Sequence, residues 1–265
     1  MGRHFLNAAL AALAIAAGGC PPPSALDRAY TLHTSWLDSG DHDALEQAAE
    51  AYGEHVTGCP GTEGCFEAFR RYGDLLLELD RHQEAAQAYR RAAEIAPTVD
   101  DAVSAARAQV TALEAWLGVP PQGMGTTRWS AGPPLIDSER PPAASDQPLH
   151  VSPPERMLVE AADLLLELDP ALRDRTGLRY QTAFLLYQRR DYDEASDRWH
   201  QMAEIDPGAA ETLSAMRILL PTHHAREAWA DLVRDGGFFL GLAGLPLDAA
   251  ERANLETMVE EARAR

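Results

Sequence analysis

The chain of 265 residues contains no lysine, so that all 23 of its basic residues are arginines. This absence excludes a phosphate-loop lysine, a Schiff-base nucleophile and a lysine general base. The 41 acidic residues give a net charge of −18, whereas neutralising nucleic-acid phosphates requires a basic surface. The composition therefore predicts a soluble acidic surface and no nucleic-acid partner.

Aromatic residues are also sparse, at 7% of the chain, and runs of β-branched residues are missing. Alanine is abundant instead, which favours helices that pack through small side chains. The length suffices for one elongated or two small domains. The composition predicts an all-α fold.

The amino terminus has the three parts of a secretory signal. Arg3 is followed by the apolar residues 5–17, which are too few to span a bilayer comfortably, and then by Gly18, Gly19 and Cys20. Small residues before a cysteine resemble the lipobox of bacterial lipoproteins, although Ala17 stands where the family usually has leucine. The resemblance implies a signal peptide over residues 1–20 and a diacylglycerol on Cys20; a plain cysteine beside an ordinary cleavage site is the alternative. Pro21 favours sorting to the outer membrane.

The other two cysteines lie in a glycine-rich loop. Export would place Cys59 and Cys65 in an oxidising compartment, which predicts a disulfide between them. A metal site formed with His55 is the alternative, but three ligands in one loop are a weak signal. We predict no bound metal and no cofactor.

Two segments repeat the same spacing of small, aromatic and proline residues. These residues are Phe69, Tyr72, Gly73, Leu76, Ala85, Tyr89, Ala92 and Pro97 in the first segment, and Thr182, Ala183, Leu186, Ala195, Trp199, Met202 and Pro207 in the second. Both segments resemble the tetratricopeptide repeat, which consists of two antiparallel helices and recurs about every 34 residues. The resemblance implies an α-solenoid of helical hairpins. Arg179 departs from the pattern, since the family prefers a bulky apolar residue there.

Further helices flank these two repeats. A degenerate hairpin over Leu32, Trp36, Ala48, Tyr52 and Pro60 precedes the first repeat, and residues 99–117 form a capping helix after it. Residues 157–168 form an apolar-faced helix before the second repeat. Helices over residues 209–220 and 223–234 follow it, then a glycine-rich break at residues 236–244 and a closing helix from Leu247.

The segment between the two repeats is rich in proline. Residues 118–154 contain nine of the eighteen prolines and four glycines, a composition that cannot bury a core. We therefore predict an N-terminal tetratricopeptide-like lobe over residues 21–117, a linker over 118–154 and a C-terminal lobe over 155–265. One solenoid interrupted by a looped-out insertion is the alternative.

The sequence contains none of the common catalytic motifs for phosphate, zinc or nucleophilic serine chemistry. His223 and His224 are adjacent, so that their side chains point about 100° apart on a helix, and we expect both to be solvated. Pairs of acidic residues are expected at helix starts and on solvated faces. The sequence therefore predicts that the protein is not an enzyme.

The resemblance implies instead a groove for a protein or peptide partner. Helix A of the second repeat would direct Tyr180, Phe184, Tyr187 and Gln188 into this groove, with the three aromatics on one helical face. Packing of the aromatics against residues 157–168 is the alternative. The matching positions of the first repeat are mixed in charge: Glu67, Arg70, Asp74, Leu77 and Glu78.

The sequence thus predicts a lipid-anchored, non-catalytic adaptor in an envelope assembly, on the periplasmic side of the outer membrane or exposed at the cell surface. An assembly factor for outer-membrane proteins is a second hypothesis. An envelope hydrolase that uses carboxylates of the groove is a third.

Overall fold

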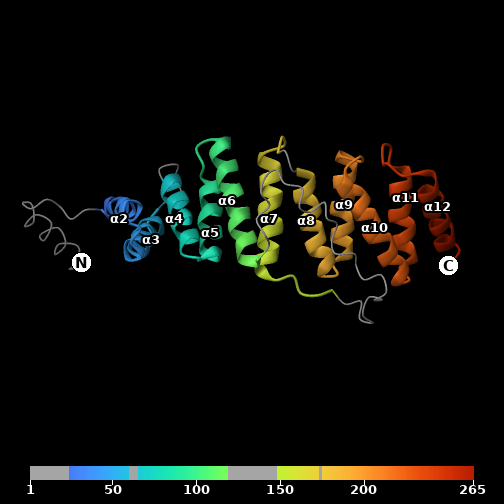
Figure 1. Ribbon diagram of the computed structural model, residues 1–265, viewed down its shortest axis with the longest axis horizontal. Helices are drawn as coiled ribbons and strands as arrows, with labels where there is room; N and C mark the ends of the chain where they lie inside the picture. Colours follow the sequence, from blue (N-terminus) through green and yellow to red (C-terminus); the bar gives the residue numbers. More distant parts are fainter. Residues whose placement is uncertain (1–23, 60–64, 119–147, 173–174) are drawn as a thin grey trace, which may run out of the picture. The chain divides into compact units, whose positions relative to one another are not determined.

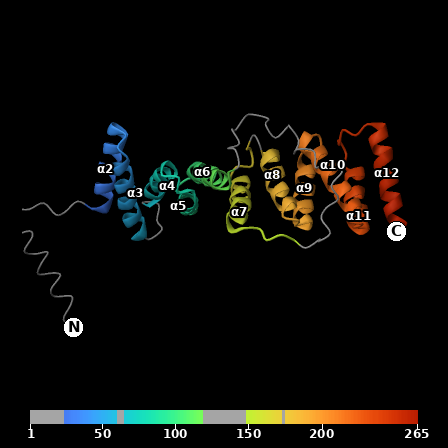
Figure 2. The same ribbon diagram turned by 60° about the horizontal axis from the view of Figure 1, so that its bottom comes forward.

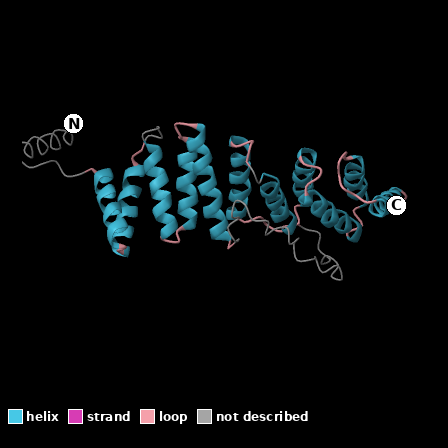
Figure 3. Cartoon of the chain, turned by 45° about the horizontal axis from the view of Figure 1, so that its top comes forward, coloured by secondary structure: helices cyan, strands magenta, loops and turns pink. Residues whose placement is uncertain are grey.

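The computed structural model describes residues 24–59, 65–118, 148–172 and 175–265. Within these ranges every regular element is a helix, and loops join the helices (Figure 3). The all-α prediction is confirmed. The helices are α2 (Ala25–Ser39), α3 (His42–Thr57), α4 (Phe66–Glu78), α5 (His82–Glu94), α6 (Val99–Leu117), α7 (Pro153–Leu168), α8 (Arg175–Gln188), α9 (Tyr192–Ile205), α10 (Ala210–Ala225), α11 (Trp229–Gly241) and α12 (Ala249–Arg263).

The chain divides into two compact units, unit 1 (Met1–Ala105) and unit 2 (Ala106–Arg265). The division falls inside α6, whereas the sequence analysis placed it in the proline-rich segment. The last part of α6 belongs to unit 2, where Gln181 of α8 donates a 3.3 Å hydrogen bond to Glu114. Residues 119–147 of the predicted linker lie outside the described residues, and the last two residues of the predicted linker, Pro153 and Pro154, belong to α7.

In unit 1 the helices pair as hairpins, with α2 against α3 and α4 against α5 (Figure 1). The residues of the repeat spacing form the contact between α4 and α5. Leu76, Ala85 and Ala92 are fully buried, and a Cβ atom on Gly73 would meet the ring of Tyr89 at 2.7 Å. Glycine is therefore required at residue 73 for the two helices to approach this closely.

Unit 2 uses the same kind of contact between α8 and α9, which lie side by side in both ribbon views (Figures 1 and 2). Ala183 and Ala195 are fully buried, and Trp199 fills the space beside them with no exposed surface. The larger core then extends through α10 and α11 to Leu255 and Val259 of α12.

The helices after the second repeat differ from those expected from the sequence. Helix α10 continues through Pro221, because the buried residues Leu219, Leu220 and His223 keep the following turn packed against the core. Helix α11 runs to Gly241 and so contains Gly236, where a Cβ atom would lie 2.4 Å from Val259. The predicted break at residues 236–244 is wrong in its first half, since α11 continues to Gly241 and Gly236 permits close packing of α11 on α12.

Two adjacent glycines of α11 allow a matched test of this packing. Gly236→Ala should lower the free energy of unfolding by about 1–3 kcal/mol, because the new methyl group overlaps Val259. Gly237→Ala should raise it by about 0.5–1 kcal/mol, since no atom lies within 4 Å of its Cβ position and alanine favours a helix. Urea denaturation followed by circular dichroism measures both changes. Equal effects of the two substitutions would contradict the packing described.

Candidate functional site

The aromatic row predicted to line a binding groove is largely internal. Tyr180 is 2% exposed and Phe184 is 8% exposed. The Tyr180 ring lies 5.9 Å from that of Trp199 of α9, and both residues belong to the core that α10 completes. The expectation that Tyr180 and Phe184 face a partner is therefore wrong, because the neighbouring helices α9 and α10 cover them. The alternative, packing against residues 157–168, holds for Tyr187, which packs against a cluster that contains Val159 of α7.

The other two predicted partner-binding residues are more accessible. The Tyr187 hydroxyl lies 2.6 Å from the hydroxyl of Thr222 of α10, and its ring is 5.4 Å from that of Tyr192. Tyr187 is therefore half-buried and held by its neighbours, whereas Gln188 at the end of α8 is exposed. Of the four predicted residues, Gln188 alone presents its side chain freely.

The structure joins Cys59 and Cys65 by a disulfide with a Cα–Cα distance of 6.0 Å. The His55 Nε2 atom lies 3.8 Å from the Cys59 sulfur. Sulfur atoms bonded to each other are not thiolate ligands, and no cluster of three metal-ligating side chains occurs in the described part of the chain. Cys20 lies outside the described residues.

A buried polar cluster in unit 2 was missed by the sequence analysis. The Asp235 carboxylate of α11 accepts a 2.9 Å hydrogen bond from Ser196 of α9. His223 Nε2 of α10 lies 2.8 Å from the same oxygen, and Arg234 donates to the other oxygen at 2.7 Å. Ser196, His223 and Asp235 are completely buried. The expectation that His223 is solvated is therefore wrong.

The protonation states of this cluster follow from its contacts. Burial alone would raise the pKa of Asp235, but hydrogen bonds from His223 and Arg234 outweigh burial and lower the pKa to about 2. Burial lowers the pKa of His200, whose Nε2 atom is 3.4 Å from Asp235. The His200 ring stacks on Phe238 with the ring centres 3.9 Å apart. The carboxylate therefore stays ionised inside the core.

Serine, histidine and aspartate invite comparison with a catalytic triad, but the contacts have a different order. In a triad the histidine contacts the serine and the aspartate orients the histidine. Here Asp235 binds both Ser196 and His223, and all three are buried. The cluster links α9, α10 and α11 and offers no accessible nucleophile. The burial of His223 could have been predicted from its spacing. It follows Met216 and Leu219 at helical intervals and so lies on the buried side of α10.

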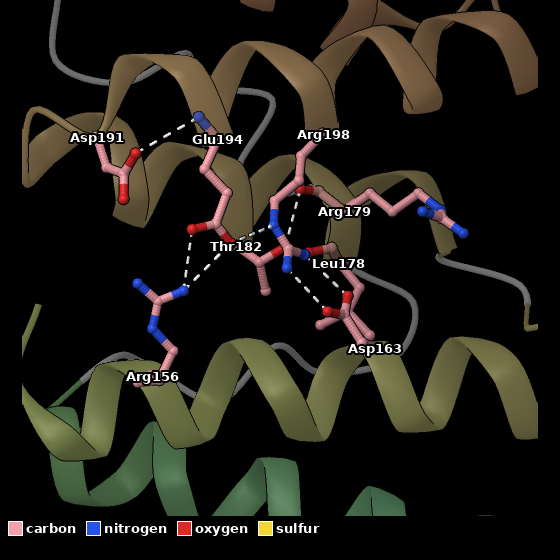
Figure 4. A network of polar contacts seen from close by, with 8 residues as sticks. All are labelled: Arg156, Asp163, Leu178, Arg179, Thr182, Asp191, Glu194 and Arg198. Atoms are coloured by element: carbon pink, nitrogen blue, oxygen red, sulfur yellow. Dashed lines mark hydrogen bonds and ion pairs between the residues drawn. The ribbon is translucent and has the colours of Figure 1, made fainter.

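A second polar network joins α7 to α9 across the start of α8 (Figure 4). Arg198 of α9 forms two hydrogen bonds of 2.8 Å with the two carboxylate oxygens of Asp163 of α7. Arg156 of α7 contacts Glu194 of α9 at 3.0 Å, and Arg198 also lies 3.3 Å from Glu194. Figure 4 shows the guanidinium of Arg179 directed away from these pairs, without a contact to any residue drawn.

In unit 1 the mixed positions of the first repeat form a polar surface on α4, hereafter the α4 surface: Glu67, Arg70, Asp74 and Glu78. Arg70 lies between Glu67 at 2.9 Å and Asp74 at 3.3 Å, and its hydrogen bond lowers the pKa of Glu67. Asp74 also accepts a 2.7 Å hydrogen bond from the buried Tyr89. Arg70 and Glu67 keep 37% and 39% of their side-chain surface exposed, so that α4 presents ordered charges to solvent.

No protein-family model and no curated protein matches the chain. Among the described residues, none of the helices combines the length and the apolar character that a membrane-spanning segment needs.

Two aspartates of α11 that share the partner Arg234 test the buried cluster. Asp235→Asn should lower the free energy of unfolding by about 3–5 kcal/mol, because it removes the buried charge that accepts hydrogen bonds from Ser196, His223 and Arg234. Asp231→Asn should cost less than about 1 kcal/mol, since its 3.2 Å contact with Arg234 is partly exposed. Chemical denaturation measures both. An equal cost at the two positions would contradict the assigned role of the cluster.

Proposed function

We propose that the protein is a non-catalytic, tetratricopeptide-like scaffold that binds a protein partner in the cell envelope. The observation that carries this proposal is the recurrence of one hairpin contact. Gly73 packs beneath Tyr89 in α4 and α5, and Ala183 occupies the matching position beside Trp199 in α8 and α9. Stacked hairpins of this kind present extended surfaces to partners. Fold alone does not establish a function, so the binding surface needs its own argument.

The α4 surface is the best candidate for partner binding in unit 1. Its charged side chains are ordered by ion pairs yet retain more than a third of their exposure. Tyr30 of α2 is 37% exposed, with the guanidinium of Arg71 5.2 Å from the centre of its ring. Tyrosine and arginine are among the residues that are enriched at protein interfaces.

The proposed location follows from the amino-terminal residues. The small residues before Cys20 resemble a lipobox, and lipid on this cysteine would hold the chain at a membrane. The proposed membrane is the outer membrane, with the helices on its periplasmic side. Assembly of outer-membrane proteins is a narrower form of the same proposal, and it predicts that the captured partner is a barrel protein.

The anchor is tested by Cys20→Ser in the full chain expressed with its own signal. The substituted chain should leave the membrane pellet and enter the soluble periplasmic fraction, because it has no thiol to acylate. Immunoblots of the fractions measure the shift, and Cys59→Ser serves as the control for loss of a cysteine elsewhere. Retention of the Cys20→Ser chain in the membrane would refute the lipid anchor.

The partner surface is tested by crosslinking, for which the missing lysines make amine-reactive reagents unsuitable. A photo-crosslinking amino acid replaces Glu78, which is exposed on α4, or Gln87, which is exposed on α5. In native membranes the first chain should give a discrete crosslinked product and the second should not. Arg70→Glu in the first chain should reduce the yield. Products of equal yield at both positions, or at neither, would contradict the proposal.

A further inference from the structure

His200 of α9 lies in the contact between α9 and α11, beside the buried polar cluster of unit 2. Its ring stacks on that of Phe238, with the ring centres 3.9 Å apart. The ring of Phe239 meets it edge-on, with the centres 5.8 Å apart. Only 17% of the His200 side chain is exposed. His200 therefore serves this contact as an aromatic side chain packed against two phenylalanines.

The Nε2 atom of His200 faces the cluster without a hydrogen bond. The atom is buried and has no hydrogen-bond partner among the described residues, although it lies 3.4 Å from a carboxylate oxygen of Asp235. A neutral imidazole tolerates such a position better than an imidazolium does, because burial penalises the charged form. The packing of His200 is therefore suited to its neutral form.

The negative charge of Asp235 is already compensated by other donors. One of its oxygens accepts hydrogen bonds from Ser196 and His223, and the other accepts one of 2.7 Å from Arg234. A proton on His200 would place a further positive charge beside Arg234. Burial lowers the pKa of His200, and Arg234 adds to this effect, whereas Asp235 offsets it only in part.

The charged and titratable groups in and around the cluster come from α9, α10 and α11: Asp197, Glu204, His223, Asp231, Arg234 and Asp235. Asp197 and Glu204 act from the helix of His200 itself and raise its pKa, but by less than burial lowers it. Helix α12 contributes apolar residues, Leu255 and Val259, to the adjoining core. These contacts together leave His200 neutral at neutral pH.

We propose that His200 makes the contact between α9 and α11 sensitive to acid, so that protonation of this side chain loosens α11 and α12 from the rest of unit 2. Ser196 and His200 connect α9 to α11 through Asp235 and Phe238. Water solvates an imidazolium better than this contact does. When the contact opens, Phe239 of α11, which is completely buried, becomes exposed.

The direction of the pH dependence follows from the lowered pKa of His200. The closed contact has its full stability above the usual histidine pKa of about 6.5. As the pH falls below this value, the open form binds a proton more readily than the closed form, so that the free energy of closing is lost. This device belongs to the chain itself and does not depend on the proposed partner.

The test compares amide hydrogen exchange in the full chain in detergent at about pH 7.5 and about pH 5.5, on either side of the usual histidine pKa. After correction for the intrinsic effect of pH on exchange, amides of α11 should lose protection several-fold at the lower pH. His200→Phe should retain this protection, because a phenyl ring preserves the stacking on Phe238 and binds no proton. His150→Phe is the control, since His150 is exposed in the same unit, and should behave like the unsubstituted chain.

A second measurement needs no substitution. In NMR spectra of the unsubstituted chain, the ring signals of His200, assigned through their contact with Phe238, should titrate with a midpoint below about 6.5. The signals of the contact with Phe238 should weaken over the same pH range. A midpoint at or above about 6.5 would overturn the proposal. Unchanged protection of α11 in acid, or an equal loss in the unsubstituted and His200→Phe chains, would overturn it as well.

Discussion

The close approach of paired helices through small residues is the constraint on which the rest of the structure depends. Gly73 leaves no room for a Cβ atom beneath the Tyr89 ring, and the fully buried Ala183 gives Trp199 the matching space in unit 2. Once an aromatic of this size occupies the contact, the residues around it must pack against it. Tyr180 and Phe184 are drawn into the same core, which removes them from any accessible groove.

Because the aromatic side chains are buried, the exposed side chains of the helices are mostly charged. Since the chain has no lysine, the basic side chains among them are arginines. A guanidinium can bind two carboxylates at once in a defined geometry, which an ammonium does less well. Arg198 accordingly contacts Asp163 of α7 and Glu194 of its own helix, and Arg70 contacts Glu67 and Asp74. The exposed faces are therefore ordered, with side chains that lose little further freedom when a partner binds.

The repeat spacing predicted the helical class and the buried residues of both hairpins, because small and aromatic residues at fixed intervals determine how closely two helices pack. The use of proline and glycine as signals of helix ends failed where packing against distant residues decides the backbone conformation. Proline ends most helices, yet Pro221 lies inside α10, where buried neighbours hold the chain. Glycine usually marks a break, yet Gly236 serves close packing against Val259. The wrong prediction that His223 is solvated has the same cause, since a helix that starts after Pro221 would place His223 at an exposed end.

The sequence alone does not show that Asp235 is buried or that neighbouring side chains compensate its charge. Asp235 is buried, but hydrogen bonds from Ser196, His223 and Arg234 satisfy its two oxygens. These hydrogen bonds offset the cost of removing the carboxylate from water. A buried charge whose partners are present is tolerated in a core, whereas removal of one partner leaves a buried group uncompensated and destabilises the fold. Asp235 is therefore a part of the core and not a group that binds a partner.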